Sequence, residues 1–216
     1  NAILPASAFI DMVIAVGRRF HGEHAFEVTN LEILQPLALS PTKMLEVATV
    51  VSAETGHIEI KSRERLNEAD WSLNVVARTR RSTSAASPKV TPPSGTPDDT
   101  ISAEDVYRIA KRFKLDYGPD FQLLQQVQRF GDRHLEIDLA APTGEGHPFV
   151  THELHPVSTD AALHGLVGLF AHLAPDNTTA PYIPVHFGAI QVYQTQAVIR
   201  RAVIIIERAS KYSIKA

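Results

Sequence analysis

The first clear pattern along the chain is a row of apolar residues at helical spacing. Phe9, Met12, Val16 and Phe20 recur every three or four positions, and residues on this spacing share one face of an α-helix. The pattern predicts a helix over residues 5–20 that is buried on most sides. Pro5 suits its first turn, where the missing N–H group of a proline costs no hydrogen bond.

Alternating apolar and polar positions then predict antiparallel strands. The expected strands cover residues 31–39, 44–51, 57–63 and 71–79. Pro36 implies an edge or a bend in the first of them, because a proline cannot donate a hydrogen bond within a sheet. The residues Glu54-Thr55-Gly56 fit a hairpin turn between the second and the third strand.

Residues 82–100 change in character. They hold four prolines among serine, threonine and glycine and offer almost nothing to bury, which predicts a semi-extended linker. A second series of elements follows, beginning with a short helix that starts at Ser102 and ends at Tyr117-Gly118-Pro119. Ser102 and Asp105 resemble a capping box in which Asp replaces Glu.

The rest of the chain repeats the earlier plan. Strands are expected over residues 123–129 and 134–140, a buried helix over 157–173, and strands over 182–192, 197–207 and from 212 onward. Ser158 or Thr159 can cap this helix. Both halves thus read as a long buried helix with three or four antiparallel strands, which predicts an α+β fold of two similar units.

A sheet wrapped around one central helix is a hot-dog arrangement, and two in tandem form a double hot-dog. We therefore expect an N-terminal hot-dog over residues 1–81, a linker over 82–100 and a C-terminal hot-dog over 101–216. We also expect the first unit to lack its start and the second its end, because the sequence begins in an apolar run and stops within a predicted strand.

Composition narrows the classes of function. The chain has 216 residues, 44% hydrophobic and 21% charged, with a formal charge of −3; this predicts neither a nucleic acid nor a membrane as partner. It contains no cysteine, which excludes disulfides, a thiolate nucleophile and cysteine-bound zinc, and fits a reducing, cytoplasmic location. No apolar run approaches the roughly 18 residues of a membrane span.

The most informative stretch is Leu154 to His164, which places Asp160 and His164 four residues apart at the head of an apolar segment. On a helix the two share a face. They could be a first-turn aspartate favoured by the helix dipole and a core histidine that found a partner. They could equally form a functional pair, because a buried carboxyl holds a proton more readily than one in water and the imidazole can orient it. The small neighbours Ala161, Ala162 and Gly165 would leave room for a substrate.

Two further groups are weaker candidates. Tyr117-Gly118-Pro119 can be a helix stop in which Gly118 adopts a positive φ, or a tight turn that fixes the Tyr117 hydroxyl near a substrate. His147, His152 and His155 could ligate a metal, but no carboxylate pattern accompanies them, and we predict no metal site. No Gly-x-Ser-x-Gly elbow, phosphate loop or dinucleotide fingerprint is present.

Four motifs in order resemble the dehydratase domain of modular polyketide synthases and animal-type fatty acid synthases. They are Ile3-Leu4-Pro5-Ala6-Ser7-Ala8-Phe9, Tyr117-Gly118-Pro119-Asp120-Phe121, His155-Pro156 through Asp160 to His164, and Ile183-Pro184-Val185-His186-Phe187. The first looks like the end of the family's His-x-x-x-Gly-x-x-x-x-Pro motif, and the third is similar to its His-Pro-x-x-x-Asp-x-x-x-Gln/His motif.

The resemblance implies a β-hydroxyacyl thioester on the phosphopantetheine arm of an acyl carrier protein as substrate, and an α,β-unsaturated thioester as product. It implies no metal or redox cofactor, the other domains of a synthase as partners, and a homodimer. Asp160 would help the β-hydroxyl leave, and His164 would orient the Asp160 carboxyl. The substrate pocket would be lined by Tyr117, Gly118, Pro119, Pro156, Leu4 and Pro5.

The resemblance also implies a catalytic histidine that the sequence does not show. Counting back from Pro5, the family's glycine would stand immediately before Asn1 and the histidine four residues earlier. Other readings stay open: a cyclase or double-bond isomerase on the same carrier-bound chains, or a non-catalytic dehydratase-like domain kept for docking or dimerisation. A free-standing acyl-CoA thioesterase or hydratase is disfavoured by the linker.

Overall fold

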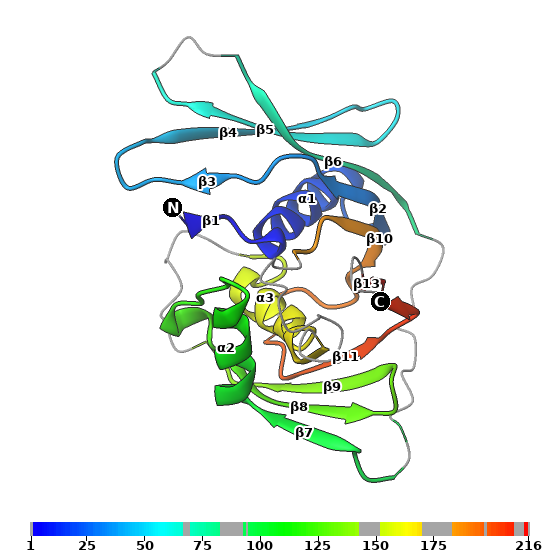
Figure 1. Ribbon diagram of the computed structural model, residues 1–216. Helices are drawn as coiled ribbons and strands as arrows, with labels where there is room; N and C mark the ends of the chain where they lie inside the picture. Colours follow the sequence, from blue (N-terminus) through cyan, green and yellow to red (C-terminus); the bar gives the residue numbers. More distant parts are fainter. Residues whose placement is uncertain are drawn as a thin grey trace. The chain divides into compact units, whose positions relative to one another are not determined.

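The structure is a computed structural model that describes residues 2–66, 70–82, 93, 95–142, 152–169, 183–196, 198–209 and 214–215. Its contacts divide the chain into two compact units, each built from helix and antiparallel sheet (Figure 1). The first unit comprises Asn1–Pro88, Thr151–Pro156 and Pro184–Gln196. The second comprises Lys89–Val150, Val157–Ile183 and Ala197–Ala216.

The first unit is one helix against a five-stranded sheet. Its elements are β1 (Ala2–Ile3), α1 (Ala6–His21), β2 (Phe26–Ile33), β3 (Ala38–Leu39), β4 (Leu45–Val51), β5 (His57–Glu64), β6 (Ser72–Arg81) and β10 (His186–Gln191). The strand order is β10-β2-β6-β5-β4, all antiparallel, and β1 pairs separately with β3.

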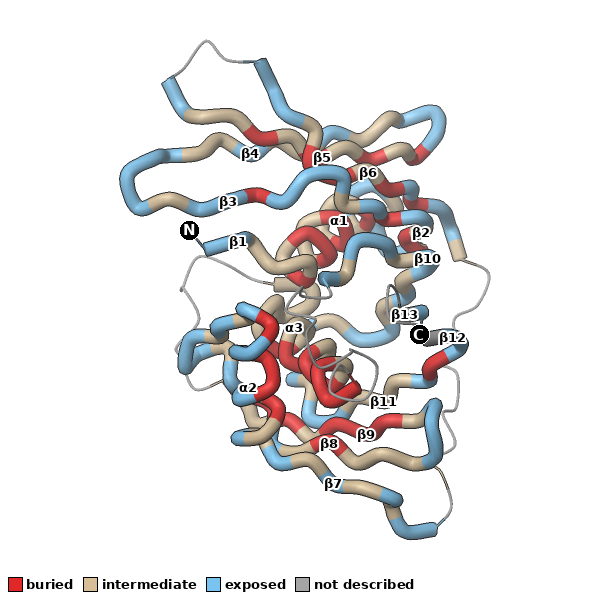
Figure 2. Tube along the Cα trace, viewed as in Figure 1, coloured by how far each residue is buried: buried red, intermediate tan, exposed pale blue. Residues whose placement is uncertain are grey.

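The core of this unit lies where α1 meets the sheet, as the buried segments in Figure 2 show. Phe9 and Val13 from α1 are buried against Leu31 of β2, Ile60 of β5 and Val75 of β6. The predicted helix is confirmed, with Pro5 as its N-cap. The predicted hairpin is confirmed as well: β4 and β5 pair up to Val51 and Ile58 on either side of the turn.

Strand β10 corrects the expected domain boundary. We assigned all of residues 101–216 to the second unit, yet β10 pairs with β2 in the register Ile190↔Val28 and Phe187↔Leu31. The side chains of Phe187 and Ile190 pack on the first core. Strand β2 would otherwise have a free edge there, and the alternation of a single strand does not reveal which edge it will join.

The second unit combines a four-stranded sheet with two helices. Its elements are β7 (Asp99–Ser102), α2 (Ala103–Arg112), the 3₁₀ turn η1 (Pro119–Phe121), β8 (Leu124–Phe130), β9 (His134–Leu139), α3 (Pro156–His164), β11 (Arg201–Ile205), β12 (Arg208–Ala209) and β13 (Ile214–Lys215). The sheet order is β11-β9-β8-β7, antiparallel throughout, and β12 pairs with β13. Helix α3 is assigned to this unit from Val157 onward.

Helix α2 begins as predicted at Ser102, whose hydroxyl oxygen accepts a hydrogen bond from the backbone N–H of Asp105 at 3.2 Å. Its apolar stripe, Val106, Ile109 and Ala110, is buried in the second core.

The bounds of the first predicted strand, residues 31–39, were wrong. Strand β2 begins earlier, at Phe26, and ends at Ile33, before Pro36.

The expected helix over residues 157–173 is confirmed in part. Helix α3 begins one residue earlier, at Pro156, and ends at His164; a turn at Gly165 and Leu166 follows, and residues 167–169 are helical again. The proline occupies the first helical position, which puts Ser158 and Thr159 inside the helix rather than at its cap. Residues 170–182 lie outside the described part of the chain.

Most of the predicted linker, residues 83–92 and 94, also lies outside the described residues. Its last two positions, Asp99 and Thr100, are not linker but the start of β7, where they pair with Arg129 and Gln128. Within the described ranges no helix is long and apolar enough to cross a membrane.

Candidate active site

Asp160 and His164 form a hydrogen-bonded pair on α3. Their i, i+4 spacing places both on one helix face, and Nε2 of His164 lies 3.0 Å from Oδ2 of Asp160. The imidazole is 2% exposed and the carboxyl 15% exposed. The buried ring thus supports a carboxyl that solvent or a small molecule can still reach, so the predicted pair is present with the acid as its accessible member.

Two tyrosine rings surround His164. The Tyr117 ring lies against the imidazole with 3.8 Å between centroids, and the Tyr107 ring meets it edge-on at 5.8 Å. The Tyr107 hydroxyl lies 3.5 Å from Nδ1 of His164, the nitrogen that does not face Asp160. The second unit therefore brings together two of the residue groups predicted from separate motifs, and adds Tyr107.

Sequence reasoning missed Tyr107 because it lies in α2, 57 residues from His164, and belongs to none of the four motifs. Its position beside the apolar residues Val106 and Ile109 was the only available signal. The backbone N–H of Leu124 donates to the Tyr107 oxygen at 3.1 Å. This bond ties the end of the side chain to the start of β8.

Both tyrosines keep their protons at neutral pH. Burial raises the pKa of Tyr107 to about 12, against the effect of the Leu124 hydrogen bond, and the Asp160 charge adds to the increase. Burial raises the pKa of Tyr117 even further, again with a contribution from the charge of Asp160. Both hydroxyls are therefore neutral and can donate a hydrogen bond.

The turn that carries Tyr117 differs from the prediction. Gly118 has φ −65°, so its conformation does not require a glycine, and a side chain at this position would meet open space. The left-handed residue after α2 is Lys114, at φ 60°. Pro119 begins the short η1 turn, and the Gln122 side-chain amide donates to the Tyr117 carbonyl at 2.8 Å.

The remaining predicted pocket residues lie in the first unit. The backbone N–H of Leu4 donates to Leu37 at 2.9 Å, and Pro5 caps the start of α1. Pro156 is the last residue of the segment 151–156 that belongs to this unit. Their role in binding a substrate stays a prediction.

An acid on α1 that the sequence analysis did not single out holds the segment leading to α3. The Asp11 carboxylate accepts a hydrogen bond from the Leu154 N–H at 2.9 Å and lies 2.7 Å from Nδ1 of His152. Two turns further along the same face of α1, Arg18 forms an ion pair with Glu153 at 2.8 Å. Because Asp11 is 13% exposed, its bonds to Leu154 and His152 form in a partly water-excluded place, where they are stronger than at the surface.

Replacing Asp11 with alanine is expected to free this segment. The variant loses the acceptor for the Leu154 N–H and the partner of His152. Because these are hydrogen bonds to a charged group, their loss should lower the free energy of unfolding by about 1–3 kcal/mol. Hydrogen–deuterium exchange should show faster exchange at Leu154 in Asp11→Ala. Asp70→Ala, at an exposed acid of the same unit, serves as control; unchanged exchange at Leu154 would refute the role of Asp11.

The predicted absence of a metal site stays a prediction. His152 and His155 do lie together, with ring centroids 5.4 Å apart, and burial, followed by the neighbouring His152, lowers the pKa of His155. His147 lies outside the described residues. Among the residues that are described, no group of three or more histidine, cysteine or acidic side chains could hold a metal ion.

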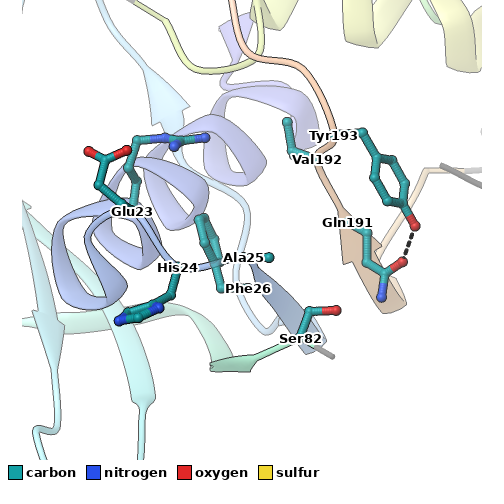
Figure 3. A pocket seen from close by; sticks show the side chains of 9 residues that line it. Glu23, His24, Ala25, Phe26, Ser82, Gln191, Val192 and Tyr193 are labelled. Atoms are coloured by element: carbon teal, nitrogen blue, oxygen red, sulfur yellow. Dashed lines mark hydrogen bonds between the residues drawn. The ribbon is translucent and has the colours of Figure 1, made fainter. Parts of the chain in front are cut away.

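Two hollows lie away from the pair. One, of about 210 Å³, lies at the end of α1 in the first unit and is lined by residues that include His24, Phe26 and Tyr193 (Figure 3). The other, of about 290 Å³, lies in the second unit beside Asp99 and Arg108. Neither is lined by a predicted site residue, so we place the candidate site by chemistry, at the Asp160–His164 pair.

The small residues of α3 have a different reason from the one expected. Ala161 is fully buried in the second core. A Cβ on Gly165 would lie 2.4 Å from Cγ1 of Ile137. A side chain at Gly165 would therefore meet the sheet, and neither residue leaves space for a substrate; the third small residue, Ala162, is half-buried against the same core.

Comparison with known families and proteins gives consistent matches. Residues 84–211 match the family model described as polyketide synthase dehydratase N-terminal domain, and residues 1–65 match that described as polyketide synthase dehydratase domain. A naringenin synthase from Pestalotiopsis fici is 28% identical over 90% of this chain, and polyketide synthase PksN from Bacillus subtilis is 24% identical over 83%. The matched region spans only 8% and 3% of these two relatives.

Solved structures share the fold. A dehydratase domain of a trans-AT polyketide synthase from Brevibacillus brevis matches with a TM-score of 0.77 and 20% identity, covering 97% of this chain and 76% of that one. The PpsC dehydratase domain from Mycobacterium tuberculosis, solved with C12:1-CoA, matches with a TM-score of 0.71 and 21% identity, covering 96% and 74%. These are double hot-dog domains, which confirms the predicted fold class.

Proposed function

Because the chain belongs to the polyketide synthase dehydratase family, we propose that it removes water from a β-hydroxyacyl thioester and leaves an α,β-unsaturated thioester. The observation that carries this proposal is the Asp160–His164 pair, a reachable carboxyl held by a buried imidazole. A β-elimination needs such an acid, since a hydroxyl leaves far more easily once it is protonated.

Asp160 is the proposed acid. Its carboxyl gives a proton to the β-hydroxyl as the Cβ–O bond breaks, and water leaves. His164 holds one carboxyl oxygen by the 3.0 Å hydrogen bond, so the other oxygen can face the substrate. The ring of Tyr117 lies against His164, and we propose that Tyr117 lines the substrate pocket next to this histidine.

The reaction also needs a base for the α-proton, whose electron pair forms the new double bond. The family resemblance assigns this step to a histidine that would precede Asn1, and we keep that assignment. The base and the acid then move one proton each, and the sum of the two steps is the loss of one water. No electrons pass to or from a second reactant in these steps. The proposed chemistry therefore requires no redox cofactor.

The proposed substrate is carried on the phosphopantetheine of an acyl carrier protein. The matched relatives are domains of multidomain polyketide synthases, which supports further synthase domains as partners. A homodimer and a cytoplasmic location remain our predictions, the latter from the cysteine-free composition.

The test is an assay of the full-length protein with a β-hydroxyacyl pantetheine thioester, followed by mass spectrometry and NMR of the products. We expect an α,β-alkene formed with the loss of one water. Formation of a ring or of a β,γ-alkene alone would instead identify a cyclase or an isomerase. A folded protein with no turnover on carrier-bound or pantetheine-bound substrates would indicate a non-catalytic domain.

A further inference from the structure

The proposed chemistry assigns no role to the hydroxyl on the far side of His164. Tyr107 reaches from α2 to within 3.5 Å of Nδ1, while the opposite nitrogen, Nε2, faces Asp160. We propose that Tyr107 is a positioning residue, which donates to Nδ1 and so holds His164 in the tautomer with its proton on Nε2. The consequence for catalysis rests on the proposed dehydratase function.

The hydrogen bonds around the Tyr107 hydroxyl indicate that it acts as a donor toward His164. The oxygen already accepts the N–H of Leu124 at 3.1 Å. Two acceptors for its own proton lie at the same distance of 3.5 Å, the carbonyl of Phe121 and Nδ1 of His164. The hydroxyl proton should go to the acceptor that would cost more free energy if it were left without a donor.

Burial favours Nδ1. His164 is 2% exposed, so a ring nitrogen left without a proton and without a donor would bear the cost of an unsatisfied buried polar group. Phe121 is only half-buried and is followed by the exposed Gln122, where water is a nearby alternative donor. Burial also raises the pKa of Tyr107 to about 12, so the hydroxyl keeps its proton to donate.

This tautomer determines what each oxygen of Asp160 can do. A proton on Nε2 points at Oδ2 of Asp160, which therefore acts as an acceptor in both protonation states of the carboxyl. The catalytic proton is then confined to Oδ1. The other tautomer would set the lone pair of Nε2 against an ionised carboxylate, two acceptors facing each other. In enzymes that depend on a histidine, the group behind the ring fixes the tautomer in this way.

The tautomer can be measured directly. In the protein labelled with ¹⁵N at the histidine ring nitrogens, His164 is assigned from the signals that disappear in His164→Gln. We expect the proton on Nε2 in the wild type and a shift toward the Nδ1-protonated form in Tyr107→Phe. A wild-type His164 protonated on Nδ1 alone would overturn the proposal, and this result needs no variant to fold. Unchanged signals in a folded Tyr107→Phe would overturn it as well.

Kinetics test the role in catalysis. Tyr107→Phe removes one hydroxyl and should lower kcat about tenfold, the effect of one lost hydrogen bond of about 1.4 kcal/mol in the transition state, with KM within about twofold. The matched control is Tyr193→Phe, whose hydroxyl donates to the Gln191 side chain outside the site (Figure 3); its kcat should not change.

The outcomes separate the two proposals. A changed tautomer with an unchanged kcat would refute the positioning role of Tyr107. An equal loss of kcat in Tyr193→Phe would refute it too, because the loss would then not be specific. If the wild type itself shows no dehydration, the proposed function fails, and the NMR measurement still decides the tautomer.

Discussion

Asp160→Asn is expected to abolish dehydration while leaving the fold intact. An amide cannot give a proton to the leaving hydroxyl, and removing a general acid typically lowers a rate by about 10²–10⁴-fold. The amide oxygen can still accept the hydrogen bond from Nε2 of His164, which lies 3.0 Å from Oδ2 in the wild type. The buried imidazole thus keeps a partner, and we expect the free energy of unfolding to change by no more than about 1 kcal/mol.

The measurement compares kcat of the wild type and of Asp160→Asn on a β-hydroxyacyl pantetheine thioester, with unfolding by urea followed in parallel. Asp132→Asn, at an acid whose side chain is fully exposed in the same unit, is the control for the loss of one negative charge. Turnover near the wild-type rate in Asp160→Asn would show that the acid lies elsewhere. A loss of rate with an equal loss of folded protein would mean that Asp160 supports the fold instead.

Gly165→Val is expected to destabilise the second unit strongly. Even a Cβ at this position would lie 2.4 Å from Cγ1 and 2.8 Å from Cδ1 of Ile137, and Ile137 is fully buried in β9. Forcing extra atoms into a packed core typically costs about 1–3 kcal/mol, and we expect a value at the upper end. Because Gly165 directly follows His164, any shift at the end of α3 also moves the imidazole and lowers kcat.

Urea unfolding of the variant checks this expectation. Gly188→Val is the matched control, since a side chain at Gly188 would meet open space on β10. In the double variant Gly165→Val with Ile137→Ala the two losses should add to less than their sum, because alanine removes both clashing atoms. A midpoint for Gly165→Val equal to that of the wild type would show that the helix and the sheet adjust without cost.

The elements predicted best from the sequence are those that local pattern determines. The turn at Glu54-Thr55-Gly56 lies between two alternating runs, and both β4 and β5 occur within one residue of the predicted bounds. Ser102 begins α2 because its hydroxyl can cap the helix without any distant partner. Asp160 and His164 share a face for the same reason, since four residues along one helix suffice to bring them together.

The sequence could not reveal what depends on distant partners. The apolar residues after His164 continue a helical pattern, yet a turn at Gly165 and Leu166 interrupts the helix where Gly165 lies close to Ile137. Tyr107 reaches His164 only because α2 and α3 belong to one core. Likewise, nothing near Asp11 in the sequence indicates that its carboxylate holds Leu154, 143 positions later.

The pairing of β10 with β2 has a consequence for biosynthesis. The sheet of the first unit cannot be completed on the ribosome until Gln191 has emerged, although β2 is synthesised long before, at Phe26–Ile33. At translation rates of roughly 5–20 residues per second, β2 has an open edge for many seconds. An open edge is a template for association with other chains. The nascent protein therefore passes through a stage in which the early half needs protection, and slower translation between the two strands would prolong it.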